Sequence, residues 1–285
     1  TATGISGSGW TTNLAALTCT RSDSLLVGSA YPAITVTVTV ATNAPASVTN
    51  IAVVSGGGET NLANNTAYDP TTINALSNGS LVNLAEWDMS ALTSSSNGFG
   101  PSPFAPTTHA TNLTLVGLTR GSGVGTNGTA ANRAWGGNTW TDTNYLAAIT
   151  NNRFATFGIA ANTGYKVSFS SISKFDYRHS ATGATNGLLQ CQIGSGEFTN
   201  VATFFYPSNV NTGGSLGPID LTVVPLLQNV GAGTNVTFRI VNWGGTSSSG
   251  TWYIFDVENS TNADFVVQGT VSQVVAPAAD LAISM

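Results

Sequence analysis

The sequence predicts an all-β protein. Within residues 33–40, the seven residues from Ile34 to Val40 alternate strictly between apolar residues and threonine, which is typical of a half-buried strand. Glycine-rich clusters separate the short apolar segments of the later chain, as turns separate strands. No long amphipathic helix is predicted, so the fold class depends on sheets packed against sheets.

The composition excludes several classes of function. Charged residues make up 7% of the 285 residues, where a typical globular domain has about 25%. The net charge is −5, and eight Lys and Arg are too few to follow a phosphate backbone, so no nucleic-acid partner is expected. Hydrophobic residues make up 41%, which is enough for a folded core and argues against disorder.

The composition also predicts a location. No stretch of about 18 apolar residues is present, so no membrane-spanning segment is predicted. The chain does not open with a basic segment followed by an apolar one, so we expect any signal peptide to have been removed. A surface of Thr, Ser, Asn and Gly fits a secreted, extracellular protein of the bacterial cell surface.

The first predicted module covers residues 1–73. Residues 33–40 form its clearest strand, residues 47–55 a second strand before a Gly-Gly-Gly turn, and residues 64–67 a short third. We expect the apolar side chains of the first two strands to form its core; they are Ile34, Val36, Val38, Val40, Ile51 and Val53.

The second predicted module covers residues 74–275. Several of its strands carry apolar residues on both faces, which predicts a two-sheet β-sandwich of jelly-roll type. Two segments, residues 81–92 and 144–151, are predicted to form short helical turns. The predicted strands are residues 112–118, 153–159, 165–175, 187–193, 219–224, 235–243, 251–257 and 263–271.

The last predicted segment, residues 276–285, is a linker followed by a single strand. Leu281, Ile283 and Met285 alternate with the smaller or polar Asp280, Ala282 and Ser284, so one face of the strand is apolar. A lone strand leaves its backbone donors and acceptors unpaired. We therefore expect these six residues to dock on another sheet.

Four motifs in the first module resemble a family. They are Gly-Ser-Gly-Trp at residues 7–10, Thr-Cys-Thr-Arg at 18–21, Tyr-Pro-Ala-Ile-Thr-Val at 31–36, and the glycine- and asparagine-rich run at 54–67. In these motifs, the module resembles the conserved repeat domain found in tandem in large bacterial surface proteins. The resemblance implies an incomplete immunoglobulin-like sandwich, because family members open with a strand similar to residues 279–285, which here stand at the other end of the chain.

The middle of the chain resembles a jelly-roll module of secreted bacterial proteins, to which no established activity belongs. This resemblance depends on five motifs, at residues 85–88, 118–121, 135–138, 175–178 and 250–253. Two explanations of the divided repeat stay open. The chain is one period of a longer repeating polypeptide, or it is a subunit whose C-terminal strand completes the first module of the next copy.

We find no pattern that predicts catalysis, and we expect a non-enzymatic protein. Glu86 and Asp88 flank Trp87, and Asp176 and Arg178 share a predicted strand face, but both pairs are more typical of structural polar contacts. The two histidines have no partner at zinc-ligand spacing. No cofactor is predicted and no metal site is assigned; structural calcium is the alternative, with Asp88 and Asp256 as candidate ligands.

Four tryptophans support a second hypothesis for the function. Trp135, Trp140, Trp243 and Trp252 each have a Gly or Thr neighbour, and an exposed group of them would stack on sugar rings. The two cysteines, Cys19 and Cys191, are too few for a disulfide scaffold, and whether they are bridged stays open.

The sequence thus predicts a structural subunit of an extracellular bacterial filament or surface layer. Its expected partners are other copies of itself, joined head to tail by strand donation. The alternative is a carbohydrate-binding or adhesive module of a large repetitive surface protein, with polysaccharide as its partner.

Overall fold

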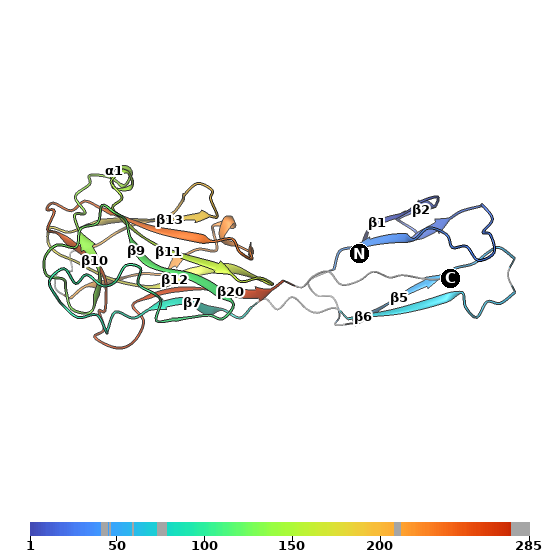
Figure 1. Ribbon diagram of the computed structural model, residues 1–285, viewed down its shortest axis with the longest axis horizontal. Coiled ribbons are helices and arrows are strands. Elements are labelled where there is room, and N and C mark those ends of the chain that lie inside the picture. The colour runs from blue at the N-terminus through green and yellow to red at the C-terminus, as the bar shows by residue number, and fades with distance from the viewer. Residues whose placement is uncertain (41–44, 46, 59, 73–78, 208–211, 275–285) are drawn as a thin grey trace. The chain divides into compact units, whose positions relative to one another are not determined.

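The computed structural model describes residues 1–40, 45, 47–58, 60–72, 79–207 and 212–274. The chain divides into two compact units, one of residues 1–76 and 275–285 and one of residues 77–274 (Figure 1). The predicted boundary between residues 73 and 74 lies in segment 73–78, outside the described residues.

The first unit consists of short antiparallel strand pairs in its described part. Strand β1 (Ala2–Gly7) pairs with β4 (Ile34–Val38), β2 (Thr11–Asn13) pairs with β3 (Thr18–Thr20), and β5 (Ser47–Val53) pairs with β6 (Thr66–Thr72). Strand β6 continues through Pro70, which lies opposite Thr49. Proline has no N–H to donate, so it is tolerated where the strand needs no hydrogen bond from that position.

The second unit contains two antiparallel sheets in the part of the chain that the structure describes. The five-stranded sheet has the order β14-β13-β18-β11-β9, and the main path of the nine-stranded sheet is β10-β19-β12-β20-β7-β8. Three short strands, β15, β16 and β17, pair along the long strand β12. The bounds are β7 Val82–Trp87, β8 Thr108–His109, β9 Leu113–Arg120, β10 Ala134–Asn138, β11 Phe154–Ala161, β12 Tyr165–His179, β13 Asn186–Ile193, β14 Thr199–Phe205, β15 Gly214–Leu216, β16 Ile219–Asp220, β17 Val230–Gly231, β18 Val236–Trp243, β19 Thr251–Phe255 and β20 Phe265–Gln273.

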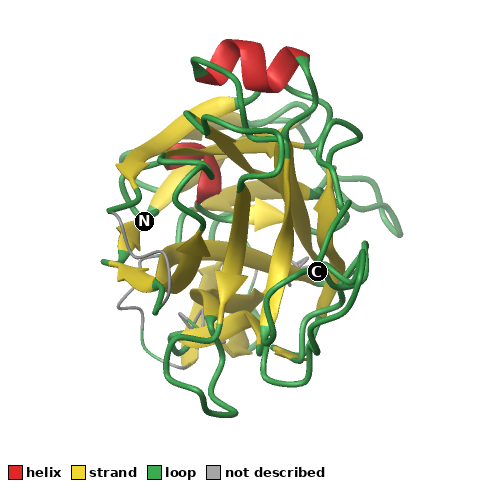
Figure 2. Cartoon of the chain, turned by 90° about the vertical axis from the view of Figure 1, so that its left-hand side faces the viewer, coloured by secondary structure: helices red, strands yellow, loops and turns green. Residues whose placement is uncertain are grey.

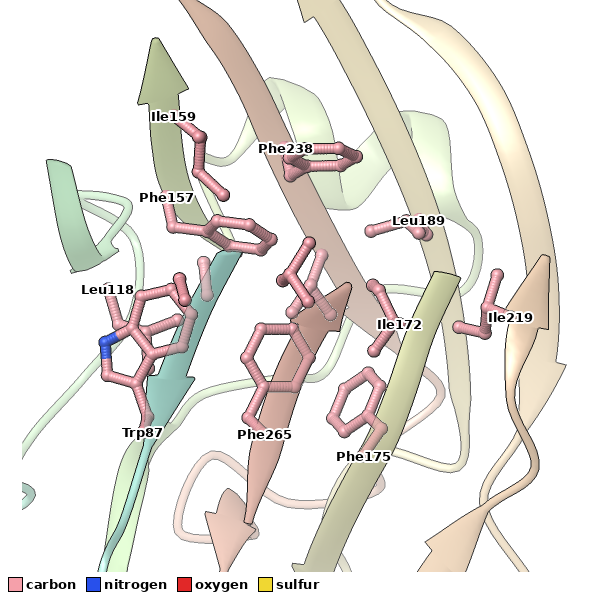
Figure 3. Packing of buried hydrophobic residues seen from close by; sticks show 14 of the residues in the cluster. Trp87, Leu118, Phe157, Ile159, Ile172, Phe175, Leu189, Ile219, Phe238 and Phe265 are labelled. Carbon is pink, nitrogen blue, oxygen red and sulfur yellow. The ribbon is translucent and has the colours of Figure 1, made fainter. Parts of the chain in front are cut away.

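Aromatic side chains from the two sheets meet in one core (Figure 3). The ring of Phe157 on β11 lies 5.0 Å from that of Phe238 on β18 and 5.4 Å from that of Phe265 on the opposite sheet. Phe169 on β12 lies 5.2 Å from Phe238. These contacts confirm the predicted all-β sandwich, while its jelly-roll type and the immunoglobulin-like type of the first unit stay predictions.

One predicted helical turn is confirmed and the other is wrong. Helix α1 (Tyr145–Thr150) begins after Asn144, whose side-chain oxygen accepts a hydrogen bond from the Ala147 N–H at 3.0 Å. It lies at the edge of the view in Figure 2. Residues 82–87 instead form strand β7, because pairing with β20 and β8 outweighs their helix-like apolar spacing.

The other described helix is the 3-10 turn η1 (Pro225–Leu227). None of the described helices reaches the length and apolarity that crossing a bilayer requires.

Strands β10 and β14 are not predicted by the sequence pattern. Strand β10 contains Gly136 and Gly137, and glycine is unfavourable in strands. A Cβ atom at Gly136 would lie 2.0 Å from the Trp252 carbonyl oxygen, so the close approach of β10 to β19 requires glycine there.

Candidate functional site

The apolar residues predicted as the core of the first unit are exposed in the described structure. Along β4, the exposed fraction is 38% for Ile34, 46% for Val36 and 59% for Val38, and Val40 just beyond it is 57% exposed. On β5 it is 61% for Ile51 and 69% for Val53, which face the same side as Tyr68 of β6 at 68%. Prediction of the strands was therefore right, but these residues do not form a buried core among the described residues.

Three of the four motifs that the sequence analysis singled out, at residues 7–10, 18–21 and 31–36, meet at a different place in the same unit. The guanidinium of Arg21 lies 5.2 Å from the ring of Trp10 and 4.0 Å from the ring of Tyr31. The Trp10 ring N–H donates to the Pro32 carbonyl at 2.8 Å, and the Tyr31 hydroxyl donates to the Asp23 carbonyl at 2.6 Å. These contacts explain why the motifs contain aromatic residues and an arginine, and they leave the β4 and β5 faces uncovered.

The predicted donor strand, Asp280, Leu281, Ala282, Ile283, Ser284 and Met285, lies outside the described residues.

Three of the four tryptophans predicted to stack on sugars are buried. Trp135 and Trp140 are each 1% exposed and Trp252 is 0% exposed. The ring N–H groups of Trp135 and Trp140 donate to the carbonyl oxygens of Pro101 and Gly137, at 2.6 and 2.8 Å. The prediction of exposure was wrong for these three, because the pairing of β10 with β19 and the packing of the core enclose the rings.

Trp243 is half-buried and packs against Tyr145 of α1, with ring centroids 6.1 Å apart. One half-buried ring does not make the predicted stacking platform.

Three carboxylates meet at one end of the nine-stranded sheet. Asp88 follows β7, Asp256 follows β19, and Asp264 precedes β20. Strands β7 and β20 pair with Trp87 opposite Phe265, so Asp88 and Asp264 lie at the same end of the ladder. One carboxylate oxygen from each of the three aspartates lies within 4.8 Å of the others.

The contacts of the three carboxylates differ. Asp88 accepts hydrogen bonds from the Ser90 N–H at 2.7 Å and from the Ser90 hydroxyl at 2.8 Å. Asp256 forms a charged hydrogen bond with Arg133 and accepts a long one, 3.3 Å, from the Ser260 N–H. Arg133 also donates to the carbonyl oxygens of Ser90 and Ser260, so it ties Asp256 to both neighbouring loops.

Asp264 is the least satisfied member of this cluster. It is 1% exposed; Oδ2 accepts a hydrogen bond from the Met89 N–H at 2.7 Å, whereas Oδ1 is buried without a hydrogen-bond partner. Burial, which penalises the charged form, raises the pKa of Asp264 to about 7.

A second group of charges borders the cluster. Lys174 Nζ lies 3.3 Å from Asp176 and 3.1 Å from Glu258, so the cation is shared between two acids. Asp176 also accepts a hydrogen bond from the Ser215 hydroxyl. The sequence suggested Arg178 as the partner of Asp176, whereas the structure pairs Asp176 with Lys174 and places Arg178 over the Phe255 ring at 5.2 Å.

The cysteines and histidines take part in no such group. Both cysteines are free thiols, Cys191 in the core at 1% exposed and Cys19 half-buried. The ring of His179 is held between the carbonyl oxygens of Ser180 and Pro207, at 2.9 and 3.1 Å.

Comparison with known proteins identifies no relative: no protein-family model, curated protein or solved structure matches the chain. The site residues are therefore assigned from their geometry alone. Sequence reasoning named Asp88 and Asp256 as metal candidates and missed Asp264, whose place beside Asp88 follows from the pairing of β7 with β20.

Proposed function

We propose that the protein is a non-enzymatic structural subunit of an extracellular bacterial filament or surface layer. In the assembly, the apolar strand at residues 280–285 of one copy adds to the first unit of the next copy. The observation that carries the proposal is the exposed apolar faces of β4 and β5, in a unit whose described hydrophobic side chains are all at least partly exposed.

Burial of apolar side chains on both partners provides the free energy for strand addition. Burying one Val, Leu, Ile or Met side chain contributes about 2 kcal/mol, so Leu281, Ile283 and Met285 together contribute about 6 kcal/mol before entropy losses. Side chains that they cover on β4 add to this, as do the backbone hydrogen bonds of a new ladder. Head-to-tail contacts of this kind extend into a polymer unless the rotation between copies closes a ring.

The test is the assembly state of the full chain compared with a chain that lacks residues 279–285. We expect sedimentation velocity and electron microscopy to detect concentration-dependent oligomers of the full chain and monomers of the truncated one. A full chain that stays monomeric at every concentration overturns the proposal, including the case in which its C-terminal strand docks within the same molecule.

A pair of variants in β4 tests the acceptor face. Val38→Asp places a charge on the apolar face, whereas Thr37→Asp places the same charge on the opposite face of the same strand. We expect V38D to prevent assembly and T37D to permit it. V38D should still bind the truncated chain through its own C-terminal strand, giving heterodimers that grow no further.

The surface composition predicts how assembly responds to salt. With 7% charged residues, few charges lie at any interface, so salt screening has little to act on. We expect the yield of oligomers to change little between about 0.05 and 0.5 M NaCl.

A further inference from the structure

The carboxylates of Asp88, Asp256 and Asp264 lie close enough to share one ion. Calcium binds oxygen ligands at about 2.4 Å, so two oxygens on opposite sides of one ion are separated by at most about 4.8 Å. The three aspartates meet that limit in every pair. The set joins the end of β7 to both ends of the connection between β19 and β20.

The charge of the cluster is not balanced by its protein neighbours. Three carboxylates face one guanidinium, that of Arg133, which is already hydrogen-bonded to Asp256. The next cation, Lys174, is held by Asp176 and Glu258. With all three carboxylates ionised, two negative charges remain in a largely buried place, where an uncompensated charge is costly.

An independent observation points to a ligand. Oδ1 of Asp264 is buried and has no hydrogen-bond partner, although the side chain is 1% exposed. Buried polar atoms in folded proteins are nearly always satisfied, and a buried oxygen without a protein donor needs a further partner, for which a bound ion or water is one explanation. Asp88 is half-buried, which leaves the cluster a side open to solvent.

We propose that Asp88, Asp256 and Asp264 bind one divalent cation, and that the cation is calcium. Carboxylate oxygens are the ligands that calcium prefers, and calcium accepts irregular sets completed by water. The ion would neutralise the two unbalanced charges and satisfy Oδ1 of Asp264. It would also fix the β19–β20 connection, residues 256–264, to the end of β7, so its expected role is structural.

The test is calcium-dependent thermal stability of the full chain after removal of metal with a chelator. At a calcium concentration about a hundredfold above Kd, we expect Tm of the second unit to rise by about 5–10 °C. Asp264→Asn keeps the shape of the side chain and removes its charge, and we expect it to abolish the rise. Glu197→Gln, which removes one exposed charge outside the cluster, should leave the rise unchanged.

A spectroscopic probe gives a readout that does not depend on stability. Terbium occupies calcium sites, and Trp87, the residue before Asp88, is placed to sensitise its luminescence. We expect saturable terbium luminescence that calcium displaces in the wild-type chain and in E197Q, and at least a tenfold weaker affinity in D264N and Asp88→Asn.

Two results would overturn the proposal. One is a chelated wild-type chain whose Tm does not change with millimolar calcium, which would assign the cluster to a protonated Asp264 and the Arg133 pair. The other is D264N responding to calcium and terbium as the wild type does.

Discussion

The two units of this chain are both built from antiparallel strands, but their described residues bury very different surfaces. In the second unit, two sheets face each other and aromatic residues from both fill the space between them (Figure 3). In the first unit, the alternation of apolar residues along β4 is more regular, yet Ile34, Val36 and Val38 are all exposed.

The difference teaches that an alternating sequence pattern determines which side chains share one face of a strand. The pattern does not determine whether another layer of the protein covers that face. A sheet face becomes a core only when a second layer of apolar side chains lies against it. The second unit supplies that layer from its own strands. The first unit, in our proposal, receives part of its layer from another copy.

The largest effect should come from the core of the second unit. Phe238→Ala removes a ring that packs on Phe157 and Phe169, so it should lower the free energy of unfolding of this unit by about 3–5 kcal/mol. Urea unfolding followed by tryptophan fluorescence measures it. Val116→Ala is the control: Val116 lies in the same sheet but is 51% exposed, so its loss should be below about 0.5 kcal/mol. Equal losses would contradict the division between core and surface.

A smaller effect should come from the ion pair beside the aspartate cluster. Arg133→Ala leaves the fully buried carboxylate of Asp256 without its charged partner. The variant should therefore lower the free energy of unfolding of the second unit by about 3 kcal/mol. This is the lower end of the range for a broken buried pair, because the Arg133 side chain is 23% exposed. Urea unfolding in the presence of a chelator measures it.

The control for the ion pair is Lys166→Ala. Lys166 donates to the neutral side chain of Asn229 at 2.8 Å, so its removal strands no buried charge and should cost less than about 1 kcal/mol. If Arg133→Ala and Lys166→Ala lower the free energy of unfolding equally, then loss of Arg133 does not leave Asp256 as an isolated buried charge in the chelated protein.

Local patterns predicted most strands but not their surroundings. Residues 33–40 were predicted from alternation alone, and β4 occupies their middle, because period-two spacing is a property of the strand itself. The burial of Trp135 and Trp252 was missed because it depends on the pairing of β10 with β19, between residues more than a hundred positions apart. Gly136, which lowers strand propensity locally, is what permits that pairing.

The cluster of Asp88, Asp256 and Asp264 also could not be predicted from local sequence patterns. Asp256 and Asp264 stand close in the sequence, but Asp88 is joined to Asp264 through the β7–β20 ladder, between the two ends of the second unit. No spacing rule connects residues that meet only after a sheet has formed. A cluster of carboxylates of this kind becomes visible from the sheet topology and not from a sequence motif.

The smallest effect should come from the first unit, where two positions of β5 lie on opposite faces. Ile51 is 61% exposed, while Val48 is half-buried on the other face. In the monomeric truncated chain, Ile51→Ala should therefore change the protection of β5 and β6 amides less than Val48→Ala does, although it removes more carbon atoms. Hydrogen–deuterium exchange of residues 47–72 measures this order.

Assembly should reverse that order. If a donated strand covers the Ile51 face, the exposed side chain of Ile51 becomes buried. Ile51→Ala should then lower the stability of the β5–β6 pair in the oligomer by about 2 kcal/mol or more. Val48→Ala lies on the other face and should cost the same in both states. An order that stays the same in monomer and oligomer would mean that the added strand does not cover Ile51, and the contrast between a self-contained unit and one completed by its neighbour would lose its basis.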